Sequence, residues 1–235
     1  GRANVNSITG GTRQQLLDMA TRGPAGQLLD AWDTAGIRHG SLSSPAYRDY
    51  LFGWCRQQID AGVDYLFMDE HTAALSGLEG YDDHSLADFR RYLLTACPQT
   101  QGWAGDDARW MSDYGIELTN RQVCPDGTMR TFEYRALLQA KGWLENPAAG
   151  DNPLAPLWSA FRSWRDDAAW KELTDRIRQY GREKGRTVLI SANGIARYVD
   201  ARELEIPYWL LTFAELADLL IDRADPRASV QIAFL

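Results

Sequence analysis

The sequence has few cysteines and no long apolar run. Its 235 residues include only 3 cysteines, at positions 55, 97 and 124. They form no Cys-x-x-Cys pair, and an odd number cannot all pair in disulfides within one chain. Cys55 falls on the apolar face of a predicted helix, so we expect it to be an ordinary core residue. No apolar run reaches the roughly 18–20 residues that span a bilayer. Neither the redox compartment nor the localisation follows from this sequence.

Positive charge is also scarce. The chain carries 25 Lys and Arg residues against 32 Asp and Glu residues, which gives a formal net charge of −7. Nucleic acids and anionic membranes select basic faces. We therefore expect no nucleic acid and no membrane among the partners.

Several sequence motifs with a known chemistry are missing. The chain has no P-loop, no Gly-x-Ser-x-Gly elbow and no Gly-x-Gly-x-x-Gly fingerprint, which disfavours nucleotide kinases, acyl hydrolases and dehydrogenases. It also lacks the His-x-His and His-Glu-x-x-His spacings of common metal sites. We expect no cofactor and no metal.

What remains is an ordinary globular composition, with 45% hydrophobic and 24% charged residues. The length suits one sizeable core, and we expect a single domain over residues 1–235. Residues 3–7 resemble the end of a strand, and residues 229–235 resemble a whole strand. Because compact domains seldom begin and end inside their sheet, we infer that the sequence is an internal piece of a longer chain. The rest of that chain would then be a partner.

The most informative segment is residues 63–71. Residues 63–68 are mostly apolar and rich in β-branched and aromatic side chains, which is typical of a buried strand in a parallel sheet. Asp69, Glu70 and His71 follow this strand directly. Ligands bind at the carboxyl ends of strands in α/β sheets and barrels. We therefore expect Asp69 or Glu70 to act on a substrate, the alternative being a helix cap or an ion pair with Arg.

The rest of the chain alternates between helical and extended patterns. Helices are predicted at residues 12–22, 45–59, 85–93, 106–114, 131–141, 154–184 and 213–222. Further strands are predicted at residues 187–192 and 207–212. This alternation predicts an α/β fold. The stretch 69–186 separates two predicted strands, which indicates a helix-rich insertion around residues 71–185 or an overlooked strand.

Other residues are candidates for the same site. Glu215 follows the predicted strand at 207–212 and is the best second carboxylate, although it also fits a solvated helix face. Asn193 follows the strand at 187–192. It could bind a sugar hydroxyl or orient a carboxylate, and an ordinary turn is an equally good reading. His71, His39 and Asn6 are possible hydrogen-bonding groups. Trp103 lies beside a loop, where an indole ring can stack on a sugar.

Several segments together resemble a known family. They are Ser44-Pro-Ala-Tyr-Arg-Asp-Tyr50, Ile59-Asp-Ala-Gly62, Val63-Asp-Tyr-Leu-Phe-Met-Asp-Glu70, Ser85-Leu-Ala-Asp-Phe-Arg-Arg-Tyr-Leu93, Thr131-Phe-Glu-Tyr-Arg-Ala-Leu137 and Ser191-Ala-Asn193. The resemblance spans roughly residues 44–215. The segments resemble those of glycoside hydrolases with a (β/α)8 TIM barrel, similar to the thermophilic β-galactosidase type.

The resemblance implies an incomplete or internal portion of a (β/α)8 barrel that cleaves a glycosidic bond of an oligosaccharide or polysaccharide. Glu70 would be the general acid/base, Glu215 the nucleophile, and Asp69 the substitute for Glu70. Two other functions stay open. One is a non-catalytic carbohydrate-binding barrel, and the other is a metal-dependent hydrolase that uses His39, Asp69, Glu70 and His71.

Overall fold

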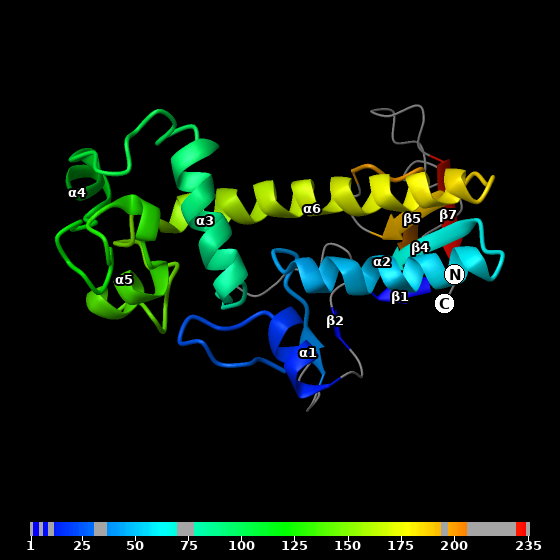
Figure 1. Cartoon of the computed structure of the whole chain (residues 1–235), viewed down its shortest axis with the longest axis horizontal. Coiled ribbons are helices and arrows are strands. Elements are labelled where there is room, and N and C mark those ends of the chain that lie inside the picture. Colours follow the sequence, from blue (N-terminus) through cyan, green and yellow to red (C-terminus); the bar gives the residue numbers. More distant parts are fainter. Residues whose placement is uncertain are drawn as a thin grey trace, which may run out of the picture. The chain divides into compact units, whose positions relative to one another are not determined.

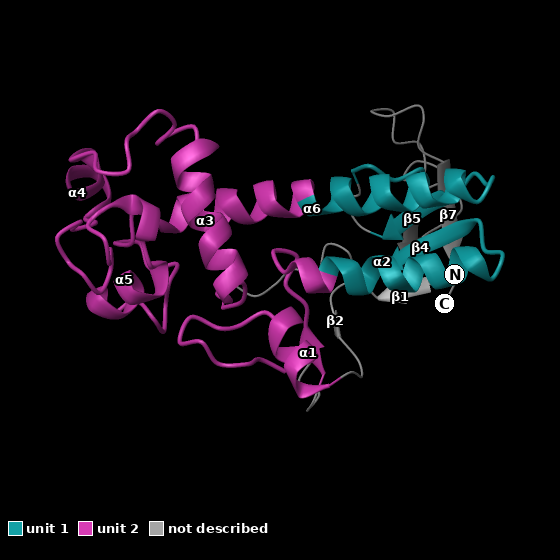
Figure 2. Ribbon diagram, in the orientation of Figure 1, with its two compact units in different colours: residues 1–6, 48–74, 169–235 teal, residues 7–47, 75–168 magenta. Residues whose placement is uncertain are grey.

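The computed structural model describes residues 2–4, 7–8, 12–30, 37–69, 78–193, 197–205 and 229–233, with side chains described in 12–30, 37–69, 78–193 and 197–201. The chain divides into two compact units (Figure 2). Unit 1 comprises residues 1–6, 48–74 and 169–235, and unit 2 comprises residues 7–47 and 75–168. Each unit is built from segments that are distant in the sequence.

Unit 1 contains a five-stranded parallel sheet with the strand order β1-β4-β5-β6-β7. Its strands are β1 (Arg2–Asn4), β4 (Tyr65–Asp69), β5 (Leu189–Asn193), β6 (Ala201–Glu205) and β7 (Ser229–Ala233). The strands predicted near residues 3–7, 63–68, 187–192 and 229–235 are confirmed within a few residues. No sequence pattern had indicated β6. The predicted strand at 207–212 and helix at 213–222 lie outside the described residues.

The TIM-barrel prediction is wrong for the part of the chain that the structure describes. A barrel needs eight parallel strands that close on themselves. The described parallel sheet has five strands, and its edge strands β1 and β7 pair only with β4 and β6. The long segment between β4 and β5 supplies helices in residues 83–183 and no strand among its described residues. Strand-helix units with polar ends are found in open sheets as well as in barrels, so these local patterns did not decide the architecture.

Two helices accompany the sheet in unit 1 (Figure 1). The first is α2 (Pro45–Asp60), whose residues from 48 onward belong to unit 1 and carry Leu51, Cys55 and Ile59 on one buried stripe. The second is α6 (Ala155–Glu183), whose residues from 169 onward belong to unit 1. These helices are joined by polar contacts, including Arg48–Glu172 at 3.0 Å, Arg176–Asp49 at 2.8 Å and Tyr180–Asp60 at 2.8 Å.

The start of α2 is fixed by a proline and a capping serine. Pro45 is the first helical residue, and the Ser44 hydroxyl accepts a hydrogen bond from the Tyr47 amide at 3.3 Å. A proline at this position loses no helical hydrogen bond, since the first amides of a helix have no partner within it. Gly62 adopts a positive φ of 98° after the helix and turns the chain toward β4. A glycine accepts this conformation without steric cost.

Unit 2 is mainly helical. It contains α1 (Arg13–Met19), α3 (Asp83–Thr95), α4 (Arg109–Tyr114), the 3₁₀ turn η2 (Met129–Thr131), α5 (Tyr134–Lys141) and the first part of α6, with a short antiparallel pair of β2 (Ser7–Ile8) and β3 (Arg38–His39). Helix α3 is capped by Asp82, whose carboxylate accepts a hydrogen bond from the Ser85 amide at 3.0 Å.

The core of unit 2 is a cluster of aromatic rings. Phe89 is 0% exposed, and its ring centroid lies 4.8 Å from Trp158, 5.0 Å from Tyr134 and 5.3 Å from Phe161. Tyr81 stacks on Trp158 at 4.6 Å. Tilted and edge-on ring pairs at these distances are favourable arrangements. The many aromatic residues of α3, α5 and α6 thus serve mainly as core.

Candidate functional site

The structure brings two of the predicted site residues together at the carboxyl edge of the parallel sheet. Asp69 ends β4 and Asn193 ends β5, the neighbouring strand. The Asn193 Nδ2 donates a hydrogen bond to the Asp69 Oδ1 at 3.1 Å. Asp69 is only 3% exposed, while Asn193 is half-buried. The sequence predicted each residue at the end of its own strand. Because the two strands lie far apart in the sequence, it did not predict that the two side chains would be in contact.

The local sequence explains why Asp69 is buried. In β4 the alternate residues Leu66 and Met68 are almost fully buried, and in β5 Ile190 and Ala192 are buried. Asp69 follows this apolar core and sits at the border of the sheet. A buried carboxyl group must be hydrogen-bonded to offset its lost hydration, and the Asn193 amide supplies one such bond. The bond also fixes the orientation of the Asp69 carboxyl group.

Four other predicted residues lie outside the described residues. They are Asn6, Glu70, His71 and Glu215. Their proposed roles therefore remain predictions.

His39 lies in unit 2, where it has an acidic neighbour that sequence reasoning missed. Its Nε2 is 3.9 Å from the Oε1 of Glu79, and both side chains are nearly buried. Burial raises the pKa of Glu79, and this effect is opposed by electrostatic interactions with His39 and Arg162. A raised carboxyl pKa is a property of many general acids.

The surroundings of Glu79 form an enclosed polar network. Burial lowers the pKa of Arg162, and the neighbouring Arg165 lowers it further. Arg165 is also buried, donates to Asp166 at 2.7 Å and lies 3.3 Å from the Ser85 hydroxyl. Glu79 is not fully satisfied in this cluster, because its Oε2 is buried and has no hydrogen-bond partner among the described residues.

Two features of the sequence could have indicated this network. Glu79 precedes a glycine, Gly80, which has a positive φ of 94° in the structure. Arg165 follows Phe161 by one helical turn, and in the structure its guanidinium lies 5.7 Å from that ring. An arginine on the apolar face of a helix indicates a buried cation, because its fork of donors needs partners.

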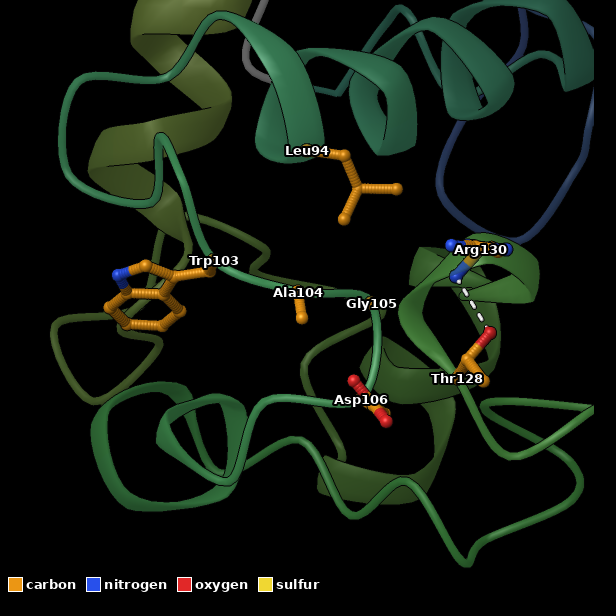
Figure 3. Close-up of a pocket in the computed structure, with 7 residues that line it drawn as sticks. All are labelled: Leu94, Trp103, Ala104, Gly105, Asp106, Thr128 and Arg130. Carbon is orange, nitrogen blue, oxygen red and sulfur yellow. Dashed lines mark hydrogen bonds between the residues drawn. The ribbon is translucent and has the colours of Figure 1, made fainter.

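Trp103 lies at a different place, beside a pocket of about 420 Å³ in unit 2 (Figure 3). The pocket is lined by Leu94, Trp103, Ala104, Gly105, Asp106, Thr128 and Arg130. The Trp103 ring makes an edge-on contact with Trp110 at 4.8 Å, and the Arg109 guanidinium lies over it at 4.4 Å. Because Arg109 covers one face of the indole, at most the other face remains for a sugar ring.

The described residues contain no group of three or more His, Cys, Asp or Glu side chains that could hold a metal ion. Among these residues, no helix is both long enough and apolar enough to cross a membrane. No protein-family model, no curated protein and no solved structure matches the chain.

Proposed function

We propose that the protein hydrolyses glycosidic bonds and that Asp69 is one of the carboxyl groups that carry the reaction. The supporting observation is the buried Asp69 carboxyl group, which the Asn193 amide holds at the carboxyl edge of a parallel sheet. This edge is where sheets of this type bind their ligands. The resemblance of the surrounding segments to glycoside hydrolases supports the same reaction.

The proposed chemistry requires a pair of carboxyl groups. One protonates the oxygen of the leaving group, and the other either attacks the anomeric carbon or activates a water molecule. In our proposal Asp69 is the general acid. The resemblance implies Glu70 for this role, with Asp69 as its substitute. The Asn193 amide keeps the Asp69 carboxyl group in a fixed orientation, and orientation is a large part of catalytic efficiency.

Hydrolysis assays of the natural protein test this proposal. The substrates are a panel of aryl glycosides and polysaccharides, and the variants are Asp69→Asn, Glu70→Gln and Glu215→Gln. The control is Asp64→Asn, which makes the same chemical change near the amino end of the same strand, where the side chain is 72% exposed.

We expect Asp69→Asn to lower kcat by about 10²–10⁴-fold, the usual contribution of general acid–base catalysis. Asp64→Asn should stay within about twofold of the parent, as surface substitutions have small effects. Parental activity in Asp69→Asn would refute the assignment. Sugar binding without any hydrolysis would favour the non-catalytic carbohydrate-binding alternative.

A further inference from the structure

The pocket in unit 2 is built separately from the candidate site at Asp69. Its volume of about 420 Å³ lies within the range of small-molecule sites. Leu94 comes from the end of α3, the loop 103–106 forms another side, and Thr128 and Arg130 come from the turn around η2 (Figure 3). All of these residues belong to unit 2, so one compact unit supplies the whole lining.

Two buried residues hold the loop of this pocket in place. The Ala104 carbonyl accepts a hydrogen bond from the Trp110 indole at 2.9 Å, and the Gly105 carbonyl accepts one from the Met129 amide at 2.5 Å. Trp110 and Met129 are both 0% exposed. Because both donors belong to the core of unit 2, the loop is fixed before a ligand arrives. A preformed site loses less binding free energy to ordering.

Gly105 allows the Arg130 side chain to lie against the loop. A Cβ at position 105 would be 3.2 Å from the Arg130 Cγ and 3.4 Å from its Nε, which is closer than a Cβ normally approaches other atoms. The missing side chain therefore lets the Arg130 stem pack on the backbone of the loop. This packing makes Arg130 part of the pocket lining.

Two opposite charges at the pocket have no counter-charge. Within the part of the chain that the structure describes, neither the Asp106 carboxylate nor the Arg130 guanidinium forms a hydrogen bond or an ion pair. The two side chains border the same pocket but do not pair with each other (Figure 3). Their hydrogen-bonding groups are therefore available to a ligand.

The lining suits a neutral ligand that is rich in hydroxyl groups. A carboxylate only accepts hydrogen bonds and a guanidinium only donates them, whereas a hydroxyl does both. One ligand with several hydroxyls can thus satisfy Asp106 and Arg130 together. The formal charges of these two residues cancel, which favours neither a polyanion nor a polycation. Leu94 and Ala104 offer apolar contact to the C–H groups of a sugar ring.

We propose that this pocket is a carbohydrate-binding site in which Asp106 and Arg130 hold hydroxyl groups of a neutral oligosaccharide. Leu94 packs against the sugar ring. The choice of a glycan as the ligand rests on the proposed glycoside hydrolysis. The site retains a polymeric substrate on the protein and takes no part in bond cleavage.

Isothermal titration calorimetry of the natural protein tests this site. The probes are neutral oligosaccharides of glucose, galactose, xylose and mannose, and free leucine is a zwitterion whose two charges match both side chains. We expect a sugar to bind the parent, and Asp106→Ala and Arg130→Ala each to weaken its binding by about 10–100-fold, because each removes hydrogen bonds to a charged group. Gly105→Ala should weaken binding by a smaller factor, because its Cβ displaces Arg130 while every hydrogen-bonding group remains.

The matched controls are Asp113→Ala and Arg121→Ala. Both residues are exposed in unit 2 and lie outside the pocket lining. Their variants should bind the sugar within about twofold of the parent, as surface substitutions have small effects. Urea midpoints close to that of the parent show that all variants are folded.

Methyl NMR locates the bound sugar. The methyl signals of Leu94 and Ala104 should shift when the sugar is added, because both residues line the pocket. The methyl signals of Leu189, which is exposed at the start of β5 in unit 1, should not shift.

Each other outcome overturns a stated part. Parental affinity in both Asp106→Ala and Arg130→Ala overturns the site, as does sugar binding that leaves the Leu94 and Ala104 signals unchanged. Binding of leucine in place of the sugars overturns the choice of ligand. Hydrolysis of aryl glycosides without sugar binding at the pocket overturns the site and leaves the glycosidase proposal standing. Sugar binding that the two variants lose, without hydrolysis by the parent, overturns the glycosidase proposal and leaves the site standing.

Discussion

The aromatic core of unit 2 allows a quantitative prediction for Phe89→Ala. Phe89 is 0% exposed and its ring packs against those of Trp158, Tyr134 and Phe161. Burial of an aromatic side chain removes about 150–250 Å² from water. At about 25 cal/mol per Å², this burial stabilises the fold by about 4–6 kcal/mol. Measured Phe→Ala substitutions in cores cost about 3–5 kcal/mol, which agrees with this range.

The measurement is urea unfolding followed by tryptophan fluorescence, which reports on Trp158 beside the substituted ring. We expect the free energy of unfolding to fall by about 3–5 kcal/mol in Phe89→Ala. Phe89→Leu should recover part of this loss, since it keeps most of the apolar volume.

Met111→Ala is the matched control in the same unit. Met111 is 56% exposed, so truncation of its side chain should change the free energy of unfolding by at most about 0.5 kcal/mol. A loss below about 1 kcal/mol in Phe89→Ala, or equal losses in Phe89→Ala and Met111→Ala, would refute the description of this cluster as the core of unit 2.

Three further predictions concern a pair of glycines, the carboxyl group of Glu79 and the cysteines. Gly40→Ala should destabilise the protein by about 1–3 kcal/mol, because the new Cβ would lie 2.0 Å from the buried Tyr47 ring. In Gly53→Ala, within α2, the new Cβ would have no atom within 4 Å, so this substitution should stabilise the protein by about 0.5–1 kcal/mol. Urea midpoints that shift in the same direction in both variants would contradict these two predictions. The native state holds the Glu79 proton more tightly than the unfolded state, so from about pH 4.3 up to the raised pKa stability should fall with pH in the parent more than in Glu79→Gln. Unfolding titrations at several pH values check this, and a pH-independent difference would refute it. Burial raises the pKa of Cys55 to about 12 and all 3 cysteines are buried, so a thiol reagent should modify none of them before unfolding and 3 after it; rapid labelling of the folded protein would contradict this.

Most local elements could be predicted from the sequence because their signals are local. Ser44 and Pro45 mark the start of α2, and Gly62 and Gly142 mark helix ends with positive φ angles of 98° and 74°. The strand at β4 follows from a short apolar run between a glycine and acids. These signals depend on a few neighbouring residues, and tertiary packing did not overrule them.

The arrangement of the elements was harder to predict. Strand β6 is rich in charge, with the sequence Ala-Arg-Glu-Leu-Glu, and therefore lacks the apolar pattern of a strand in a parallel sheet. Its place in the sheet comes from pairing with β5 and β7, which lie elsewhere in the chain. Sequence reasoning also did not identify Asp69 as the carboxylate that Asn193 would contact, since 124 positions separate the two residues.

The most direct test of Asp69 as the general acid is the dependence of the Asp69→Asn effect on the leaving group. A dinitrophenyl leaving group departs without a proton, whereas an alkyl or sugar alcohol needs one from the acid. We predict that Asp69→Asn will lower kcat/KM for an alkyl glycoside or oligosaccharide by about 10²–10⁴-fold and change it little for the dinitrophenyl glycoside. An equal effect on both substrates, or no effect on either, would contradict the account.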